Sequence, residues 1–74
     1  MAKLPIVSGR EVVKRLKKVG FILVRQRGSH MILRREAPPK MTVSIPDRKE
    51  LKRKTLKNIL RQVGLTVYQF EKLS

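Results

Sequence analysis

The chain contains no cysteine, a single histidine and only three aromatic residues among its 74 positions. Without cysteine it has neither a disulfide framework, nor a thiolate nucleophile, nor a cysteine-based zinc site. One histidine and five acidic residues also disfavour a transition-metal site, because such sites gather three or four ligands of these types. We therefore expect no metal and no cofactor. With so few aromatic rings, the core must consist mainly of Val, Ile and Leu.

Acidic side chains are also scarce, since five Asp and Glu stand against nineteen Lys and Arg and the formal net charge is +14. This balance is typical of proteins that bind polyanions, and an anionic partner, nucleic acid or acidic protein, relieves the repulsion among the cations. Solubility alone does not require so one-sided a charge. The apolar stretch near the N-terminus is interrupted by Pro5 and is too brief for a signal sequence or a membrane span. We expect a cytoplasmic protein with no membrane contact.

A chain of this length has room for one compact core, so we expect a single domain over residues 1–74. Residues 1–7 are predicted to be an extended lead-in. Ser8 then opens a helix, because its hydroxyl can cap the first turn while Glu11, three residues later, reaches back in a capping box. Apolar residues at helical spacing predict that this helix covers residues 9–18.

Three short apolar segments that follow this helix are typical of strands. Residues 21–26 are rich in strand-favouring side chains, and residues 29–35 form the second strand after a turn at Arg27-Gly28. Residues 36–40 contain two prolines, which remove ladder donors and therefore predict a loop. Residues 41–46 alternate apolar and polar side chains, the pattern of a strand with one buried face.

The last third of the chain is predicted to be helical. A basic linker over residues 47–54 precedes a helix over 55–63, whose apolar side chains repeat at helical spacing and whose stop is a glycine. Thr66 and Gln69 form a second capping pair, which predicts a short C-terminal helix. Three apolar residues are expected to pack this last turn on the body: Tyr68, Phe70 and Leu73.

This order predicts an α+β fold in which a helix, three antiparallel strands and a second helix are followed by a short C-terminal helix. Short loops between the strands favour a three-stranded antiparallel meander. Both longer helices must bury an apolar stripe, and one face of the sheet is the only platform large enough for them. The opposite face is then open, which makes it a natural ligand surface.

The only histidine lies in a compact polar segment. Gly28 permits a backbone with positive φ and lets a phosphate approach closely, and the Ser29 hydroxyl can donate a hydrogen bond to it. Arg25 and Arg27 add positive charge next to His30. Imidazole, with a reference pKa of about 6.5, is the side chain best suited to exchanging protons at neutral pH.

RNA supplies a matching reaction for such a segment. Removal of the 2′-hydroxyl proton lets that oxygen attack the neighbouring phosphorus, and protonation of the departing 5′-oxygen completes the cleavage. Cations stabilise the transition state and no metal is needed, so RNA is favoured over DNA, which lacks the 2′-hydroxyl. Alternatively, His30 is an ordinary strand residue or a phosphate contact. A single histidine also leaves the second proton-transfer role to water, a phosphate oxygen or a lysine.

A second cluster of cations surrounds the start of the predicted helix 55–63. Side-chain charge combined with the free N–H groups of a helix N-terminus makes a favourable phosphate site, although a solvated helix face is the plainer interpretation. Lys49 and Lys52 are the residues that we expect to hold an RNA backbone. No aromatic platform for base stacking accompanies the cations, which favours recognition of backbone and shape over sequence. The cations of this run are Arg48, Lys49, Lys52, Arg53, Lys54, Lys57 and Arg61.

With these motifs in place, the chain resembles the HicA family, the mRNA-cleaving toxins of HicA/HicB toxin–antitoxin pairs. The resemblance covers almost the whole chain and rests on SGRE at 8–11, GF at 20–21, RQRGSH at 25–30, MTVSIP at 41–46 and TLKNILRQVGL at 55–65. It implies a fold like that of double-stranded-RNA-binding domains, ribonuclease activity on mRNA, a catalytic histidine matching His30, and inhibition by a HicB-type antitoxin.

The leading hypothesis is therefore a toxin of a type II toxin–antitoxin system that acts as a metal-independent endoribonuclease. His30 is its general acid or base, Gly28 and Ser29 shape the phosphate pocket, and four cations hold the RNA backbone. An acidic antitoxin is expected to cover the His30 surface. The alternative is a non-catalytic module that recognises structured RNA by shape and backbone. The four cations are Arg25, Arg27, Lys49 and Lys52.

Overall fold

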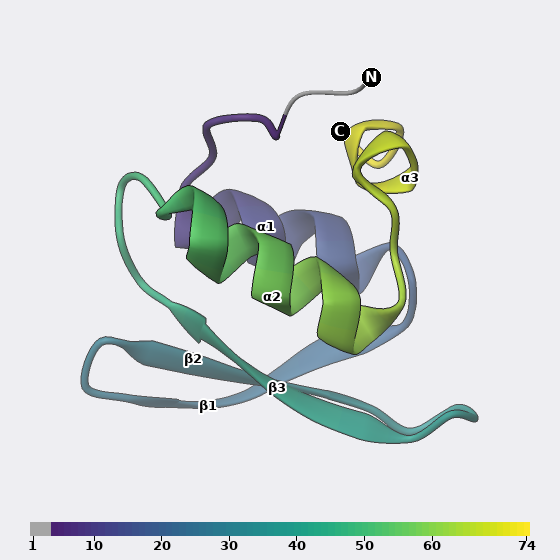
Figure 1. Cartoon of the computed structure of the whole chain (residues 1–74). Coiled ribbons are helices and arrows are strands. Elements are labelled where there is room, and N and C mark those ends of the chain that lie inside the picture. Colours follow the sequence, from purple (N-terminus) through teal and green to yellow (C-terminus); the bar gives the residue numbers. More distant parts are fainter. Residues whose placement is uncertain (1–3) are drawn as a thin grey trace.

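The computed structural model describes residues 4–74, so the first three residues of the predicted lead-in lie outside the described part of the chain. The observed order of elements confirms the predicted α+β fold, with a short helix at the C-terminal end (Figure 1). The elements are α1 (Gly9–Lys17), β1 (Phe21–Arg27), β2 (His30–Arg35), β3 (Met41–Pro46), α2 (Arg53–Val63) and α3 (Val67–Glu71).

The start of α1 confirms half of the predicted capping box. Ser8 Oγ accepts a hydrogen bond from the Glu11 backbone N–H at 3.0 Å, as expected of an N-cap. The Glu11 carboxylate does not reach back to the cap. It accepts a hydrogen bond from Arg15 Nε at 2.8 Å, because a charge-assisted bond one turn along the helix is stronger than a bond to a neutral N–H.

The start of α3 shows the complete capping box that the sequence predicts there. Gln69 N–H donates to Thr66 Oγ1 at 3.0 Å, and Thr66 N–H donates to Gln69 Oε1 at 2.9 Å. Phe70 is fully buried, as expected. Tyr68, however, is 62% exposed, so the prediction that it packs on the body is wrong. Residues two apart point to different sides of a helix, so only one of these two rings can face the core.

The three strands form an antiparallel sheet in the order β1-β2-β3, and the helices α1 and α2 lie together on one face of it (Figure 1). Alternation along β2 places Met31 and Leu33 against the helices, where both are buried. His30 and Arg34, one residue out of phase, are exposed. Because Met31, Ile32 and Leu33 are all apolar, the sequence does not distinguish the two faces of this strand, and pairing with the neighbouring strands settles them.

Strand β1 carries the one irregularity of the sheet. Leu23 pairs with Leu33 and Arg25 pairs with Ile32, so the register shifts at Val24, which is typical of a β-bulge. The strand ends one residue later than predicted, and β2 begins at His30 because Ser29 belongs to the turn. Leu23 remains partly exposed on this edge strand, although its partner Leu33 is fully buried.

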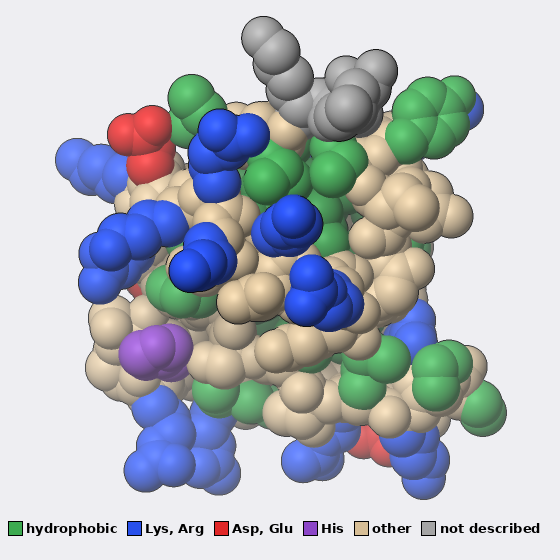
Figure 2. Space-filling view, in the orientation of Figure 1, with side chains coloured by type: hydrophobic (Ala, Val, Ile, Leu, Met, Phe, Trp, Pro, Cys, Tyr) green, Lys and Arg blue, Asp and Glu red, His purple; other side chains and the backbone are tan. Residues whose placement is uncertain are grey.

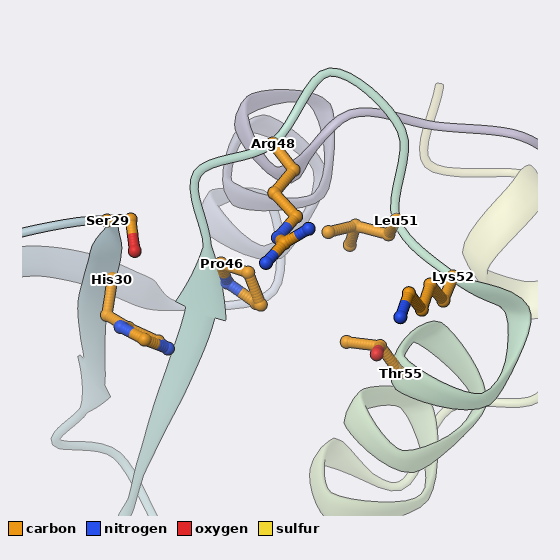
Figure 3. Close-up of a pocket in the computed structure, with 7 residues that line it drawn as sticks. All are labelled: Ser29, His30, Pro46, Arg48, Leu51, Lys52 and Thr55. Atoms are coloured by element: carbon orange, nitrogen blue, oxygen red, sulfur yellow. The ribbon is translucent and has the colours of Figure 1, made fainter.

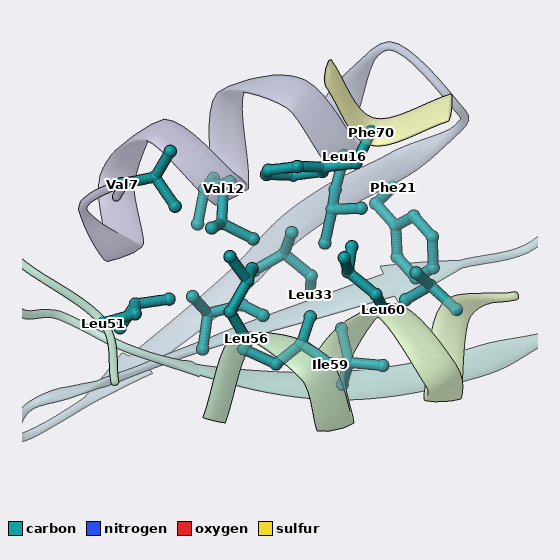
Figure 4. Close-up of a cluster of buried hydrophobic side chains, with 14 of the residues drawn as sticks. Val7, Val12, Leu16, Phe21, Leu33, Leu51, Leu56, Ile59, Leu60 and Phe70 are labelled. Carbon is teal, nitrogen blue, oxygen red and sulfur yellow. The ribbon is translucent and has the colours of Figure 1, made fainter. Parts of the chain in front are cut away.

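The core is a single cluster of mainly aliphatic side chains between the sheet and the helices (Figure 4). Leu16 from α1, Leu33 from β2 and Leu56 from α2 meet there, and Phe21 and Phe70 contribute its two aromatic rings. Among residues 4–74 no polar or charged residue is buried. The prediction of a core built mainly from Val, Ile and Leu is confirmed.

Helix α2 begins two residues before the predicted position. Leu51 is buried, and its N–H donates to the Val7 carbonyl at 2.9 Å, so the linker is anchored to the body just before the helix. Gly64 ends the helix in the left-handed conformation, at φ 77°, as the sequence predicts. Within the described chain, no helix has both the length and the apolar character needed to cross a membrane.

Candidate active site

The turn between β1 and β2 brings the only histidine to the end of the sheet. Gly28 adopts φ 57°, a left-handed backbone conformation that residues other than glycine rarely adopt. After this turn the Ser29 carbonyl accepts a hydrogen bond from the Asp47 N–H at 2.7 Å. His30 then pairs with Arg27 on one side and with Pro46 on the other. The start of β2 is thus fixed to the residues that follow β3.

Asp47 connects this turn to two further elements. Its carboxylate accepts a hydrogen bond from Arg10 Nε of α1 at 3.3 Å and another from Gln26 Nε2 of β1 at 3.1 Å. These bonds, the one from Arg10 foremost, hold the pKa of the Asp47 carboxyl below its ordinary value. A single ionised side chain therefore links α1, β1 and the segment after β3 beside the histidine turn.

Gly9, the first residue of α1, rests directly on the same segment. Its N–H donates to the Arg48 carbonyl at 2.9 Å. A Cβ atom at this position would overlap the carbonyl oxygen of Pro46. Only glycine therefore allows the helix to approach so closely, and this approach fixes the backbone on both sides of Asp47.

A shallow hollow of about 170 Å³ opens between the end of the sheet and the start of α2. Figure 3 shows Ser29 and His30 on one side of it, and Arg48 and Lys52 extending from the other side. Its lining combines an imidazole, two cations, two hydroxyl groups and two apolar side chains. The lining residues are Ser29, His30, Pro46, Arg48, Leu51, Lys52 and Thr55.

The surroundings of the hollow are strongly cationic. In Figure 2 Lys and Arg side chains gather above and below the only histidine, with few acidic groups on the same face. Lys52 is the N-cap of α2, makes no side-chain capping bond, and is followed by a first turn without an acidic residue. The N–H groups at this helix end therefore add to the positive potential, which suits the binding of a phosphate.

The hollow brings together some of the predicted site residues and leaves others outside it. Ser29, His30 and Lys52 line it, whereas Gly28 shapes the turn next to it. Arg25 and Arg27 lie on β1 and are exposed, and the register pairs Arg27 with His30. Lys49 lines a neighbouring depression, which shares only Arg48 with this hollow.

Two further polar residues, besides the apolar Pro46 and Leu51, line the hollow and were not among the predicted site residues. Arg48 was part of the basic run, but nothing in the sequence distinguished it from the other six cations there. Thr55 was included only as the first residue of a helix motif. Its position in the first turn of α2 becomes informative once that helix end is seen to face His30. Among residues 4–74, no three His, Cys, Asp or Glu side chains are arranged to hold a metal ion.

Comparison with known protein families shows to which family the chain belongs. The family model described as the HicA toxin of bacterial toxin–antitoxin systems matches residues 9–65. The chain belongs to the HicA toxin family. The match begins at the first residue of α1 and ends just after α2, so it includes every residue of the hollow. No curated protein matches the chain significantly. Membership makes the chain the toxin of a toxin–antitoxin pair and implies an antitoxin partner.

Proposed function

We propose that this toxin is a metal-independent endoribonuclease that cleaves mRNA in the cytoplasm, with His30 as its catalytic residue. The observation that carries the proposal is that the only imidazole shares one hollow with Arg48, Lys52 and the first turn of α2. Proton transfer and phosphate binding are thereby available at the same place. The HicA family assignment supports the same activity.

The proposed reaction needs only RNA, water and the side chains of the hollow. A base takes the proton of the 2′-hydroxyl, and the 2′-oxygen forms a bond to the adjacent phosphorus. The bond from phosphorus to the 5′-oxygen breaks, and that oxygen receives a proton, which leaves a cyclic phosphate and a free 5′-hydroxyl. His30 serves as the base or the acid, and Lys52 or water completes the pair.

The remaining site residues hold the RNA backbone. Lys52 and Arg48 flank the scissile phosphate and stabilise the charge that develops on it, together with the N–H groups of α2. The Ser29 hydroxyl donates to a phosphate oxygen, and Gly28 leaves open space next to the turn. The neighbouring phosphates contact Arg25, Arg27 and Lys49, which are exposed around the hollow.

The antitoxin that the family implies is proposed to be an acidic HicB-type protein that covers the His30 surface. The excess of cations around the hollow favours a partner of opposite charge. A partner at this position blocks RNA and neutralises the cations that would otherwise hold it.

Replacement of the histidine tests the proposal. His30→Ala is expected to reduce cleavage of an mRNA in a buffer containing EDTA by a factor of about 10² to 10⁴, the usual contribution of general acid–base catalysis. His30 is exposed, so the variant should keep the circular dichroism spectrum, the unfolding temperature and most of the RNA affinity of the wild type.

The matched control is Thr42→Ala, a similar truncation of an exposed residue on β3 that is outside the hollow. It should cleave at the wild-type rate. Cleavage by His30→Ala at that rate would show that the histidine is not catalytic. A wild-type protein that binds structured RNA but never cuts it would instead indicate the non-catalytic RNA-binding module.

A further inference from the structure

Strand β1, at one edge of the sheet, carries an exposed apolar run. Ile22, Leu23 and Val24 are 53%, 41% and 40% exposed, and they follow one another on β1. Within residues 4–74 no strand pairs with the outer edge of β1, because the sheet order is β1-β2-β3. Leu23 pairs with the buried Leu33 and faces the helices, whereas Ile22 pairs with the exposed Arg34 and faces the other side of the sheet. Exposed apolar side chains on an unpaired edge strand are typical of protein-binding surfaces.

Beside this run lies a groove of about 440 Å³ between α1 and β1. Its lining contains the apolar side chains of Val13, Leu23 and Met31 together with the amide of Gln26. Its rim carries three cations of α1: Arg10, Lys14 and Lys17. The groove shares no residue with the hollow of His30, although Arg10 and Gln26 of the groove bond to Asp47 beside the hollow.

The charge and the apolar lining of the groove indicate which kind of molecule fits it best: a second copy of the chain, RNA or a segment of another protein. A second copy of the chain would bring another charge of +14 against the cationic rim, which opposes self-association. RNA would find the cations, but the apolar lining offers no aromatic ring on which a base could stack. A protein segment with carboxylates for the rim and aliphatic side chains for the apolar lining satisfies both parts of the groove.

We propose that the groove between α1 and β1 docks an acidic amphipathic segment of a partner protein. The segment inserts an aliphatic side chain over Leu23, and its carboxylates face Lys14 and Lys17. The bulge at Val24, in the pairing of β1 with β2, bends the strand and makes its free edge a poorer template for an added strand, so side chains contribute more to recognition. This docking does not depend on the proposed cleavage, since His30 does not line the groove.

A synthetic peptide in which leucine and glutamate alternate is a suitable probe, titrated into the isotopically labelled full chain and followed by NMR. The largest shifts are expected at Val13, Lys17 and Leu23, with little change at Lys52 and Thr55 of the hollow. Leu23→Ser should weaken binding about tenfold, because an apolar contact is lost. Lys14→Gln with Lys17→Gln should weaken it about fivefold.

The matched control for the two lysines is Lys40→Gln with Lys72→Gln, which changes the net charge equally but outside the groove. This control should weaken binding less than twofold. The two groove lysines are exposed, so their double variant reports on docking even where Leu23→Ser affects folding. His30→Ala should bind the peptide like the wild type, so a failure of the cleavage proposal leaves this test intact.

Three outcomes would overturn the docking proposal. The first is equal binding of a peptide in which serine replaces leucine, since this would reduce the interaction to general charge attraction. The second is a set of shifts centred on the hollow of His30. The third is an RNA oligonucleotide that shifts Leu23 and Lys17 more than the peptide does, which would assign the groove to nucleic acid.

Discussion

The N-termini of α1 and α2 lie next to the same segment after β3, but they are built in opposite ways. The start of α1 is closed: Ser8 caps it, Gly9 donates to the Arg48 carbonyl, and Arg10 is bonded to Asp47. The start of α2 is open, because its N-cap Lys52 makes no side-chain bond. One helix end is used within the fold, and the other faces the hollow of His30.

This difference shows that, in a small domain, one helix N-terminus can stabilise the fold while another is left free to bind a ligand. Free N–H groups at a helix end cost stability unless a side chain, water or a ligand satisfies them. At α1 they are satisfied internally, and the residues that do so fix the loop on which the hollow depends. At α2 they are left for an anion, and the surrounding cations make that anion favourable.

The largest expected effect comes from opening the closed end. Gly9→Ala places a methyl group where it overlaps the Pro46 carbonyl, so α1 must move away from the loop. We expect the free energy of unfolding to fall by about 3 kcal/mol, as measured by urea denaturation. Gly64→Ala is the control, since it has open space and only a positive φ, and it should cost about 1 kcal/mol. Equal losses would show that the close approach of α1 is unimportant.

A smaller effect is expected from closing the open end. Lys52→Ser gives α2 an N-cap hydroxyl like that of α1, while Lys52→Ala removes the same charge without adding a cap. The serine variant should be about 1 kcal/mol more stable than the alanine variant in thermal unfolding. Both should bind RNA more weakly than the wild type. If the two variants are equally stable, the first turn of α2 is already satisfied and the contrast with α1 does not hold.

The smallest effect concerns the ionisation of Asp47. Its pKa is lowered in the folded protein from the ordinary value of 3.8, so its charge contributes stability above about pH 4. This contribution is lost as the pH falls through the lowered pKa. Asp47→Asn should therefore be less stable than the wild type at pH 7, with a difference that shrinks toward pH 3.

The control for Asp47 is Glu36→Gln, which neutralises an exposed carboxylate 3.7 Å from Arg34 in the ion pair that they form. Its stability difference from the wild type should be close to zero at pH 7 and should change little with pH. A stability difference between Asp47→Asn and the wild type that persists unchanged at pH 3 would mean that the negative charge of Asp47 is not what stabilises the fold.

The order of the elements could be predicted from the sequence because the signals for it are local. Ser8 and Thr66 mark helix starts, Gly64 marks a helix end, and two prolines mark the loop over 36–40. Alternation in β3 also predicts its buried face correctly. Two side chains were placed wrongly: Tyr68, because Phe70 takes the side of α3 that faces the core, and Glu11, because Arg15 is a stronger partner than the cap N–H.

The composition of the candidate site could be predicted only in part. His30, Ser29 and Lys52 were identified because a glycine turn and a run of cations are visible in sequence. The contacts of Asp47 join residues 37 and 21 positions apart, and no local pattern records them. The same holds for Arg48 and Thr55, which become neighbours of His30 only when β3 and α2 are packed.

The sequence by itself determined the fold class, the family, the cationic character and the single imidazole, because these depend on composition and short-range pattern. Only the tertiary structure decided which helix end faces the histidine and which is closed against the loop. It also decided that the apolar run of β1 lies on an unpaired edge beside a cationic groove. Strand register and helix packing are set by contacts between distant residues, and those contacts exist only in the folded chain.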